Sequence, residues 1–164
     1  NNIAHLANLS IGQGELMLSP VSILTLYSAI ASGGVYYIPS LVEGTLKDGR
    51  LNEYKIGKPT RVMSENTADI IKTALESVIN EGTGEDAKPT KITAAGKTAT
   101  AQTGKFVNGI EINEGWFCGF FPVENPAYIV VVFSENTRRQ SKNCSAIFAE
   151  IADKIAEIKD LEQN

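Results

Sequence analysis

The sequence is poor in the residues that build metal centres and disulfide frameworks. It has one histidine, His5, and two cysteines, Cys118 and Cys144, in 164 residues. These are too few for a His/Cys zinc site or for a disulfide scaffold. Cys118 falls inside an expected strand and Cys144 near an expected helix start, so the sequence gives no geometry for a bridge between them. We expect two separate thiols.

Long apolar runs and an excess of positive charge are also missing. No uninterrupted apolar run approaches the roughly 20 residues that cross a bilayer. Lys and Arg number 15 against 19 Asp and Glu, a net charge of -4, which argues against nucleic acid as the main partner because phosphate binding needs clustered cations. Hydrophobic residues still make up 43% of the chain. This is enough to bury the core of one domain, or of a large piece of one.

Capping residues and apolar spacing predict three helices. The first begins after the N-cap Ser19 and ends at Gly33-Gly34, and we expect it to be buried because it is apolar on nearly every side. Ser64 caps the second helix, and the third spans residues 145–158. The apolar faces expected for these two helices are Ile70, Ile71, Ala74, Leu75, Val78 and Ile79 in the second, and Ile147, Phe148, Ile151, Ala152, Ile155 and Ile158 in the third.

Two regions between the helices predict β structure. Asp48-Gly49 indicates a small hairpin within residues 35–56. Residues 92–134 predict a three-stranded meander with tight turns at Asn108-Gly109 and within 122–126. The succession of helices, hairpin and meander is typical of an α+β fold.

The last strand and the first turn of the meander give further expectations. Residues 128–133 lack polar alternation, so we expect that strand to be buried on both faces. A two-residue turn at Asn108-Gly109 pairs Thr100 with Phe117 and Thr98 with Gly119.

Residues 95–102 (AGKTATAQ) are the segment best suited to chemistry. Their small side chains let a ligand approach the backbone, while Lys97 and the hydroxyls can donate hydrogen bonds to an anion. Gly96-Lys97-Thr98 also matches the end of a nucleotide-binding phosphate loop. That loop requires glycine where Lys91 stands and a helix immediately afterwards, and neither is expected here. The nucleotide-binding alternative is therefore disfavoured.

Further blocks in a fixed order place this segment in a family. They are residues 9–16 (LSIGQGEL), 19–20 (SP), 29–34 (AIASGG), 95–102 (AGKTATAQ), 116–122 (WFCGFFP) and 130–136 (VVVFSEN). The succession resembles the C-terminal part of the transpeptidase domain of class B penicillin-binding proteins and covers nearly the whole chain. We therefore expect residues 1–164 to be the C-terminal portion of one transpeptidase domain, with the N-terminal half of that domain absent from this sequence.

The resemblance implies a fold and a reaction. The fold is a partial penicillin-binding-protein and serine β-lactamase-like one: α+β, with a three-stranded antiparallel meander packed with helices and a small hairpin beside it. The full-length protein to which this sequence would belong, the parent, is then a serine-type D,D-transpeptidase that cross-links peptidoglycan. In that reaction a serine attacks the D-Ala-D-Ala carbonyl of a stem peptide, D-alanine leaves, and a neighbouring stem's amine resolves the acyl-enzyme. β-Lactams imitate the substrate, and no metal or organic cofactor is implied.

Three motifs converge on this chemistry in the family, Ser-x-x-Lys, Ser-x-Asn and Lys-Thr/Ser-Gly, and only the third is present, as Lys97-Thr98-Ala99. By resemblance, Lys97 is catalytic and supports the proton relay and the positive field. Thr98 and Thr100 bind the substrate's terminal carboxylate, and the Thr100 N–H is one oxyanion-hole donor. Ala99 stands in this substrate-binding stretch where the family usually has glycine, and on a strand its methyl shares a face with Lys97. Trp116 either borders the cleft or, as is commoner for an aromatic in a sheet, belongs to the core.

The nucleophile is expected outside this chain. No serine is followed three places later by lysine. Ser-x-Asn triplets begin at Ser64, Ser134 and Ser141, where they are explained by a helix cap, a strand end and the lead-in to the last helix. The fragment alone should therefore be inactive.

The resemblance also implies partners and a location. The parent binds stem peptide and β-lactams on the extracytoplasmic face of a bacterial cell membrane, tethered only through the absent N-terminal segment. Two strands from that segment would flank residues 128–133, so in the fragment this strand is an open edge that invites self-association. The alternative function is a non-catalytic penicillin-binding-like sensor or scaffold, for which Ala99 is the support.

Overall fold

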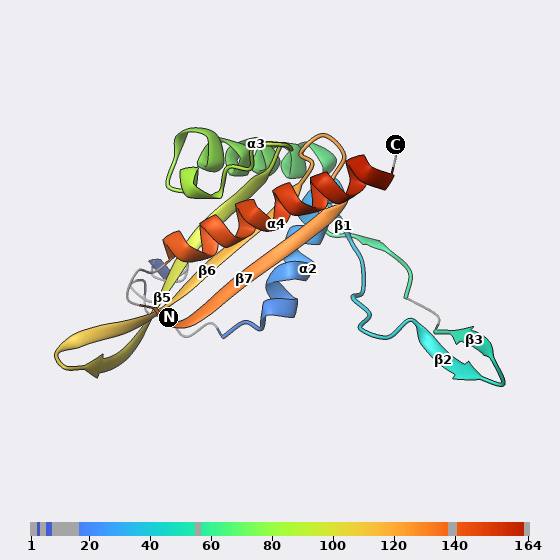
Figure 1. Ribbon diagram of the computed structural model, residues 1–164, viewed down its shortest axis with the longest axis horizontal. Coiled ribbons are helices and arrows are strands. Elements are labelled where there is room, and N and C mark those ends of the chain that lie inside the picture. Colours follow the sequence, from blue (N-terminus) through green and yellow to red (C-terminus); the bar gives the residue numbers. More distant parts are fainter. Residues whose placement is uncertain (1–2, 4–5, 8–16, 55–56, 138–140, 163–164) are drawn as a thin grey trace.

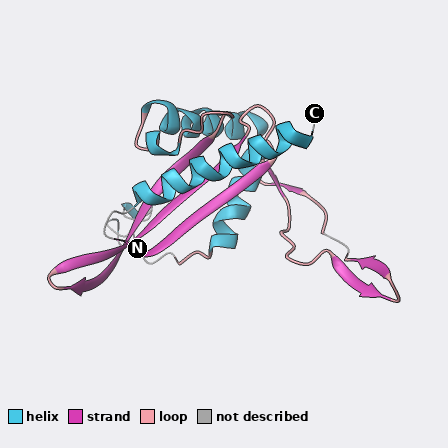
Figure 2. Cartoon of the chain, in the orientation of Figure 1, coloured by secondary structure: helices cyan, strands magenta, loops and turns pink. Residues whose placement is uncertain are grey.

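The computed structural model describes residues 3, 6–7, 17–54, 57–137 and 141–162. The elements in chain order are α2 (Pro20–Ala31), β1 (Val35–Tyr36), β2 (Gly44–Lys47), β3 (Arg50–Glu53), β4 (Thr60–Arg61), α3 (Glu65–Glu81), the 3-10 helix η1 (Glu85–Ala87), β5 (Ala95–Val107), β6 (Ile110–Phe121), β7 (Tyr128–Thr137) and α4 (Ser141–Glu162). Helix α4 lies across one face of the β5-β6-β7 sheet, α2 packs on the other face, and α3 runs beside β5 (Figure 1). The α+β expectation is confirmed, as the distribution of helices and strands in Figure 2 shows.

The expected caps of the first two helices and the two hairpin turns are confirmed, whereas the last helix begins at Ser141, four residues earlier than expected. The Ser19 hydroxyl accepts a hydrogen bond from the Ser22 N–H at the start of α2, and the Ser64 hydroxyl accepts one from the Thr67 N–H at the start of α3. The Asp48-Gly49 and Asn108-Gly109 turns both have positive φ at each residue, as two-residue hairpin turns require. The Gly12-Gln13-Gly14 segment lies outside the described residues.

The meander has the expected antiparallel order β5-β6-β7, but its predicted register is wrong beyond the turn. Val107 pairs with Ile110 as a two-residue turn demands, yet Thr98 pairs with Phe117 and Thr100 with Gly115. The register shifts between Gln102 and Lys105. Because the shift is two residues, every side chain keeps its predicted face of the sheet.

Residues 103 and 104 produce the shift. Gly104 adopts φ +66°, a backbone conformation open to glycine, with nothing within 4 Å of where a Cβ would stand. The Thr103 hydroxyl donates to the Ile112 carbonyl and accepts from the Lys105 N–H at 3.1 Å. These side-chain bonds close the bulge, which a turn dipeptide alone cannot reveal.

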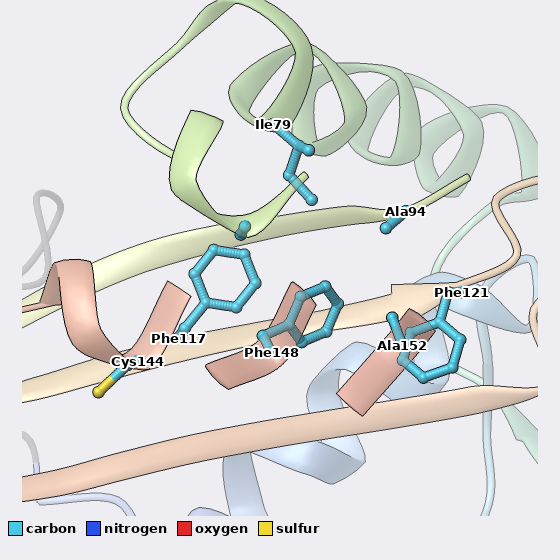
Figure 3. Packing of buried hydrophobic residues seen from close by; sticks show 8 residues of the cluster. Ile79, Ala94, Phe117, Phe121, Cys144, Phe148 and Ala152 are labelled. Carbon is cyan, nitrogen blue, oxygen red and sulfur yellow. The ribbon is translucent and has the colours of Figure 1, made fainter. Parts of the chain in front are cut away.

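The core between α4 and the sheet is built on aromatic rings (Figure 3). Phe117, Phe121 and Phe148 are each 0% exposed, and the Phe117 and Phe148 ring centroids lie 4.7 Å apart. Gly96 of β5 pairs directly with Gly119 of β6, and the absence of side chains at both positions leaves room for the rings. A Cβ at Gly119 would come within 2.8 Å of the Phe148 ring, and one at Gly96 within 2.7 Å of the Phe117 ring.

A second core occupies the opposite face of the sheet. Ile30 and Ala31 of α2 pack there with Ala95 and Phe120. Cys118 is buried on this face, whereas Cys144 is buried in the α4 core. The two thiols are therefore free and separated by the sheet, as expected.

Burial of the helices differs from the sequence expectation at particular positions. On α2, Val21 is 42% and Leu26 52% exposed, so this helix buries mainly its C-terminal end. On α3, Ile70 is 63% exposed and Ala74 is also exposed, because Ala68 and Ile79 form the buried face. The α4 expectation is likewise wrong at two positions, since Ile147 is 44% and Ile158 54% exposed. That helix begins at Ser141, so the Ser141 triplet lies inside its first turn and does not precede it.

Strand β7 is half-buried on both faces, and the expectation of full burial is wrong. Helices α4 and α2 each contact it, but β6 is its one partner strand among the described residues. Residues 128–134 are therefore partly exposed along the outer edge. No helix within the described residues has the length and apolarity needed to span a membrane.

One carboxylate joins α4 to the lead-in of β5. Asp153 accepts hydrogen bonds from the Thr90 N–H at 2.8 Å, the Thr90 hydroxyl at 3.0 Å and the Lys91 N–H at 2.9 Å. One turn later, hydrogen bonds from Lys154 and Lys91 lower the pKa of Glu157 to about 2. The start of β5 is thus held at a set place along α4.

We predict that Gly119→Ala lowers the free energy of unfolding by about 1–3 kcal/mol, because the added methyl would press on the Phe148 ring and on the Ala95 carbonyl. Denaturant unfolding of the chain measures the change. The control is Gly57→Ala, whose methyl would meet the flexible end of the Ile38 side chain, and it should change stability far less. Equal effects would contradict close packing at Gly119.

We also predict that Asp153→Ala lowers the free energy of unfolding by about 1–3 kcal/mol, since two backbone N–H groups and a hydroxyl lose a charged acceptor. Asp69→Ala is the matched control, because the Asp69 carboxylate makes a surface ion pair with Lys72 at 3.2 Å. It should cost at most about 0.5 kcal/mol. An equal loss in both variants would show that the Asp153 contacts contribute nothing special.

Candidate active site

Strand β5 divides the four predicted site residues between the two faces of the sheet. Lys97 and Ala99 stand opposite Cys118 and Trp116, on the face that α2 covers. Thr98 and Thr100 stand opposite Phe117 and Gly115, on the face that α4 covers. The alternation of a strand imposes this division. The four residues therefore meet only along the margin of the strand.

That margin is the edge of the sheet. Strand β5 is first in the order β5-β6-β7, with β6 as its one partner strand among the described residues. Alternate residues of an edge strand direct their N–H and C=O groups away from the sheet, where they can bind an extended peptide or stabilise an oxyanion. Thr100 lies on this edge strand, and this position is compatible with the predicted role of its N–H as an oxyanion-hole donor.

The Lys97 ammonium lies along this margin. Its Nζ is 3.0 Å from the Thr98 carbonyl oxygen, 3.2 Å from Thr98 Oγ1 and 3.4 Å from Thr83 Oγ1. Thr83 and Thr98 Oγ1 atoms are 3.5 Å apart. The structure thus brings Lys97 and Thr98 together through their side chains, and both contact a residue from the end of α3.

Thr83 contacts the Lys97 ammonium, and the sequence alone does not predict this contact. The Gly82-Thr83-Gly84 triplet ends α3. A hydroxyl between two glycines is a weak signal by itself. Only the packing of α3 beside β5 places this hydroxyl at the lysine.

Aromatic side chains border Ala99. Trp116, opposite Ala99, is half-buried, and its ring centroid lies 4.2 Å from that of Phe133. Ala99 itself is exposed, so its methyl stands on the open part of this face beside Lys97. Trp116 therefore both packs against a neighbouring strand and borders the site face.

Titratable groups behind Lys97 remain neutral. Burial raises the pKa of the Cys118 thiol, which stands directly opposite Lys97 on β6. Burial, and then the Cys118 thiolate, raise the pKa of the Tyr27 hydroxyl. Neither group supplies an anion to Lys97 at neutral pH, and a thiol with a raised pKa is a poor nucleophile.

The nucleotide-binding alternative is wrong, because a phosphate loop must be followed at once by a helix. Residues Ala95–Val107 form a strand, so no helix N-terminus follows Gly96-Lys97-Thr98. Ser64 caps α3 as expected, whereas Ser134 lies inside β7, opposite Gly115 and three residues before the strand ends at Thr137. The hydrogen bonds of the Lys97 ammonium go to threonine oxygens.

Comparison with known families and proteins agrees with this geometry. Residues 4–157 match the family model described as penicillin binding protein transpeptidase domain. Stage V sporulation protein D of Bacillus subtilis is 33% identical over 80% of this chain and 21% of its own length. Penicillin-binding protein PbpB of Mycobacterium tuberculosis is 32% identical over 82% of this chain and 21% of its own length.

A solved structure shares the fold. Penicillin binding protein 3 of Mycobacterium tuberculosis, complexed with aztreonam, superimposes with a TM-score of 0.84 at 28% identity, covering 96% of this chain and 38% of that one. The chain thus spans about a fifth of the length of these curated relatives. The match over residues 4–157, together with the meander that carries the Lys97 motif on its edge strand, shows that the chain belongs to the penicillin-binding-protein transpeptidase family.

Proposed function

We propose that residues 1–164 form the C-terminal portion of the transpeptidase domain of a peptidoglycan D,D-transpeptidase. The observation that carries the proposal is the Lys97 ammonium, held by threonine oxygens along the open margin of β5 in a chain of this family. The nucleophilic serine would come from sequence outside these residues. The fragment by itself would then have no acyl-transfer activity.

The proposed reaction has two acyl-transfer steps. A serine oxygen forms an ester with the penultimate D-alanine carbonyl of a stem peptide, and the peptide bond breaks as the leaving D-alanine amine takes up a proton. The amine of a neighbouring stem then attacks the ester, a new peptide bond forms, and the serine recovers its proton. A β-lactam would acylate the same serine by opening its ring. Each step needs a proton carrier and donors for a tetrahedral oxyanion.

The residues of this chain would form one side of the active-site cleft in which these steps take place. Lys97 would place a positive charge and a proton donor at the end of the strand, and exposure of its side chain leaves it accessible. Thr98 and Thr100 would bind the terminal carboxylate of the stem peptide through their hydroxyls. By the family resemblance, the Thr100 N–H would be one oxyanion donor from this edge strand.

A second function, a non-catalytic penicillin-binding-like sensor or scaffold, is favoured by one observation. The Ala99 methyl stands exposed on the Lys97 face, where the family motif usually has glycine. If the complete domain brings the nucleophile close to this face, the methyl narrows the space for it. Ala99→Gly in the parent separates the two functions, since an active enzyme should acylate at least as fast with glycine there.

The names of the relatives support a setting in cell-wall synthesis. A relative in Mesostigma viride is named a peptidoglycan D,D-transpeptidase FtsI homolog. By membership of the same family, we place the parent at the extracytoplasmic face of the cell membrane, attached through sequence outside residues 1–164. Stem peptide and β-lactams are its proposed ligands.

We predict that fluorescent penicillin labels the full-length parent and that Lys97→Ala lowers the labelling rate by at least about 100-fold, as loss of a general acid-base group does. Gel fluorescence over a time course measures the rate. Lys105→Ala is the control, because Lys105 is exposed on the same strand beyond the bulge and should leave the rate unchanged. Residues 1–164 alone should take up no label, and a penicilloyl adduct on a serine of this fragment would contradict the proposal.

We also predict that the fragment self-associates through the outer edge of β7, whose apolar strand has β6 as its partner among the described residues. Sedimentation velocity should show an average mass that rises with concentration. Hydrogen exchange should show β7 amides becoming more protected as concentration rises, with the β2-β3 hairpin amides unchanged as an internal control. A monomer at every concentration would rule out this association.

A further inference from the structure

We propose that Thr83 is a positioning residue for Lys97, a role that rests on the proposed function. Thr83 lies 14 residues before Lys97 in the sequence and belongs to the turn that ends α3. Its Oγ1 is 3.4 Å from Lys97 Nζ and 3.5 Å from Thr98 Oγ1. The hydroxyl therefore contacts two of the proposed site residues at once.

The turn that carries Thr83 is built from backbone hydrogen bonds. The Gly84 N–H donates to the Val78 carbonyl at 3.0 Å, and the Ala87 N–H donates to the Gly84 carbonyl at 2.8 Å. A Cβ at Gly82 or Gly84 would come within 3.0 Å of Val78, so the turn lies close against the last turn of α3. The chain path on both sides of Thr83 is therefore set without any contribution from its side chain.

The Thr83 hydroxyl is thus not needed to end the helix. The bonds that cap α3 run between main-chain atoms, and the flanking positions have no side chains. The side chain of Thr83 instead reaches β5, where its contacts are the Lys97 ammonium and the Thr98 hydroxyl. The placement of this hydroxyl points to a role at the site.

Lys97 needs such a contact because, within the part of the chain that the structure describes, its other acceptors lie on its own strand. The carbonyl oxygen and Oγ1 of Thr98 are 3.0 Å and 3.2 Å from Nζ, and both belong to the next residue. Contacts within one strand do not set the ammonium relative to the rest of the domain, and lysine has a long flexible stem. Thr83 adds an acceptor from a different element, so it restricts Nζ to the margin of β5 between α3 and the sheet.

Restricting the ammonium bears on rate more than on ligand affinity. A proton donor acts only when it lies within hydrogen-bond reach of the reacting atom, and small displacements are costly to the rate. A neutral hydroxyl positions the ammonium without cancelling its charge, whereas a carboxylate would cancel it. Loss of the Thr83 hydroxyl should therefore slow acylation while leaving the initial binding of a β-lactam intact.

The test uses Thr83→Val in the full-length parent, which removes the hydroxyl and keeps the branched shape. We expect the first-order acylation rate constant with a fluorescent penicillin to fall about tenfold, as loss of about 1.4 kcal/mol of transition-state stabilisation gives. The penicillin concentration at half-maximal rate should change less than about twofold. Thr83→Ser, which restores the hydroxyl, should return the rate constant to within about twofold of the wild type.

The control is Thr73→Val, a matched loss of a hydroxyl on α3. Thr73 Oγ1 donates to the Asp69 carbonyl at 3.0 Å within the helix and is exposed. This variant should acylate at the wild-type rate. Thermal unfolding should give the same midpoint for the Thr83→Val and Thr73→Val proteins.

The outcomes separate this inference from the proposed function. Absence of labelling in the wild type, or labelling unaffected by Lys97→Ala, would refute the proposed function itself. With labelling and its dependence on Lys97 established, a wild-type rate constant in Thr83→Val would overturn the positioning role. A change in half-maximal concentration alone would overturn it in favour of direct ligand contact. Failure of Thr83→Ser to restore the rate, or a larger loss of thermal stability in Thr83→Val than in the control, would overturn it in favour of a structural role.

Discussion

The close approach of α4 to the sheet is the constraint on which the rest of the structure depends. It requires the facing glycines Gly96 and Gly119, because a methyl at either position would come too near an aromatic ring. With both side chains absent, Phe117 and Phe148 pack in contact and are fully buried. Burial of apolar side chains such as these is the main favourable term in the free energy of folding a domain. The same glycine, Gly96, immediately precedes the proposed catalytic residue Lys97, so the packing of the core also sets the face on which the lysine stands.

The alternation of side chains along β5 then decides which face of the sheet each proposed site residue occupies. Once Gly96 faces α4, Lys97 must face the other way and Thr98 must face α4 again. Only the margin of the strand brings the ammonium and the Thr98 hydroxyl together, and the turn at the end of α3 meets this margin. The proposed site is therefore formed by the edge of β5 and the end of α3. Cys118, opposite Lys97 on β6, has a pKa raised by burial and supplies no negative charge to the lysine.

The bulge shows how a local element can be predicted while its pairing is not. The Asn108-Gly109 dipeptide predicts the turn correctly, and the register near it is the expected one. Thr103 and Gly104 then add two residues to β5, through a positive φ and side-chain hydrogen bonds that depend on the partner strand. The side chains of β5 keep their predicted faces of the sheet because the number of added residues is even. An insertion of one residue would have placed Lys97 against α4.

Sequence alone determined the order of the elements, the caps at Ser19 and Ser64, the hairpin turns and the family of the chain, because these depend on local conformational preference and on short ordered motifs. Tertiary structure alone decided which helix faces are buried, as the exposed Ile70 and Ile158 show, since burial depends on what packs against a face. It also decided the partner of Lys97. A hydroxyl 14 residues away reaches the ammonium only because α3 packs beside β5, and side-chain contacts between elements leave no mark on the local pattern of residues.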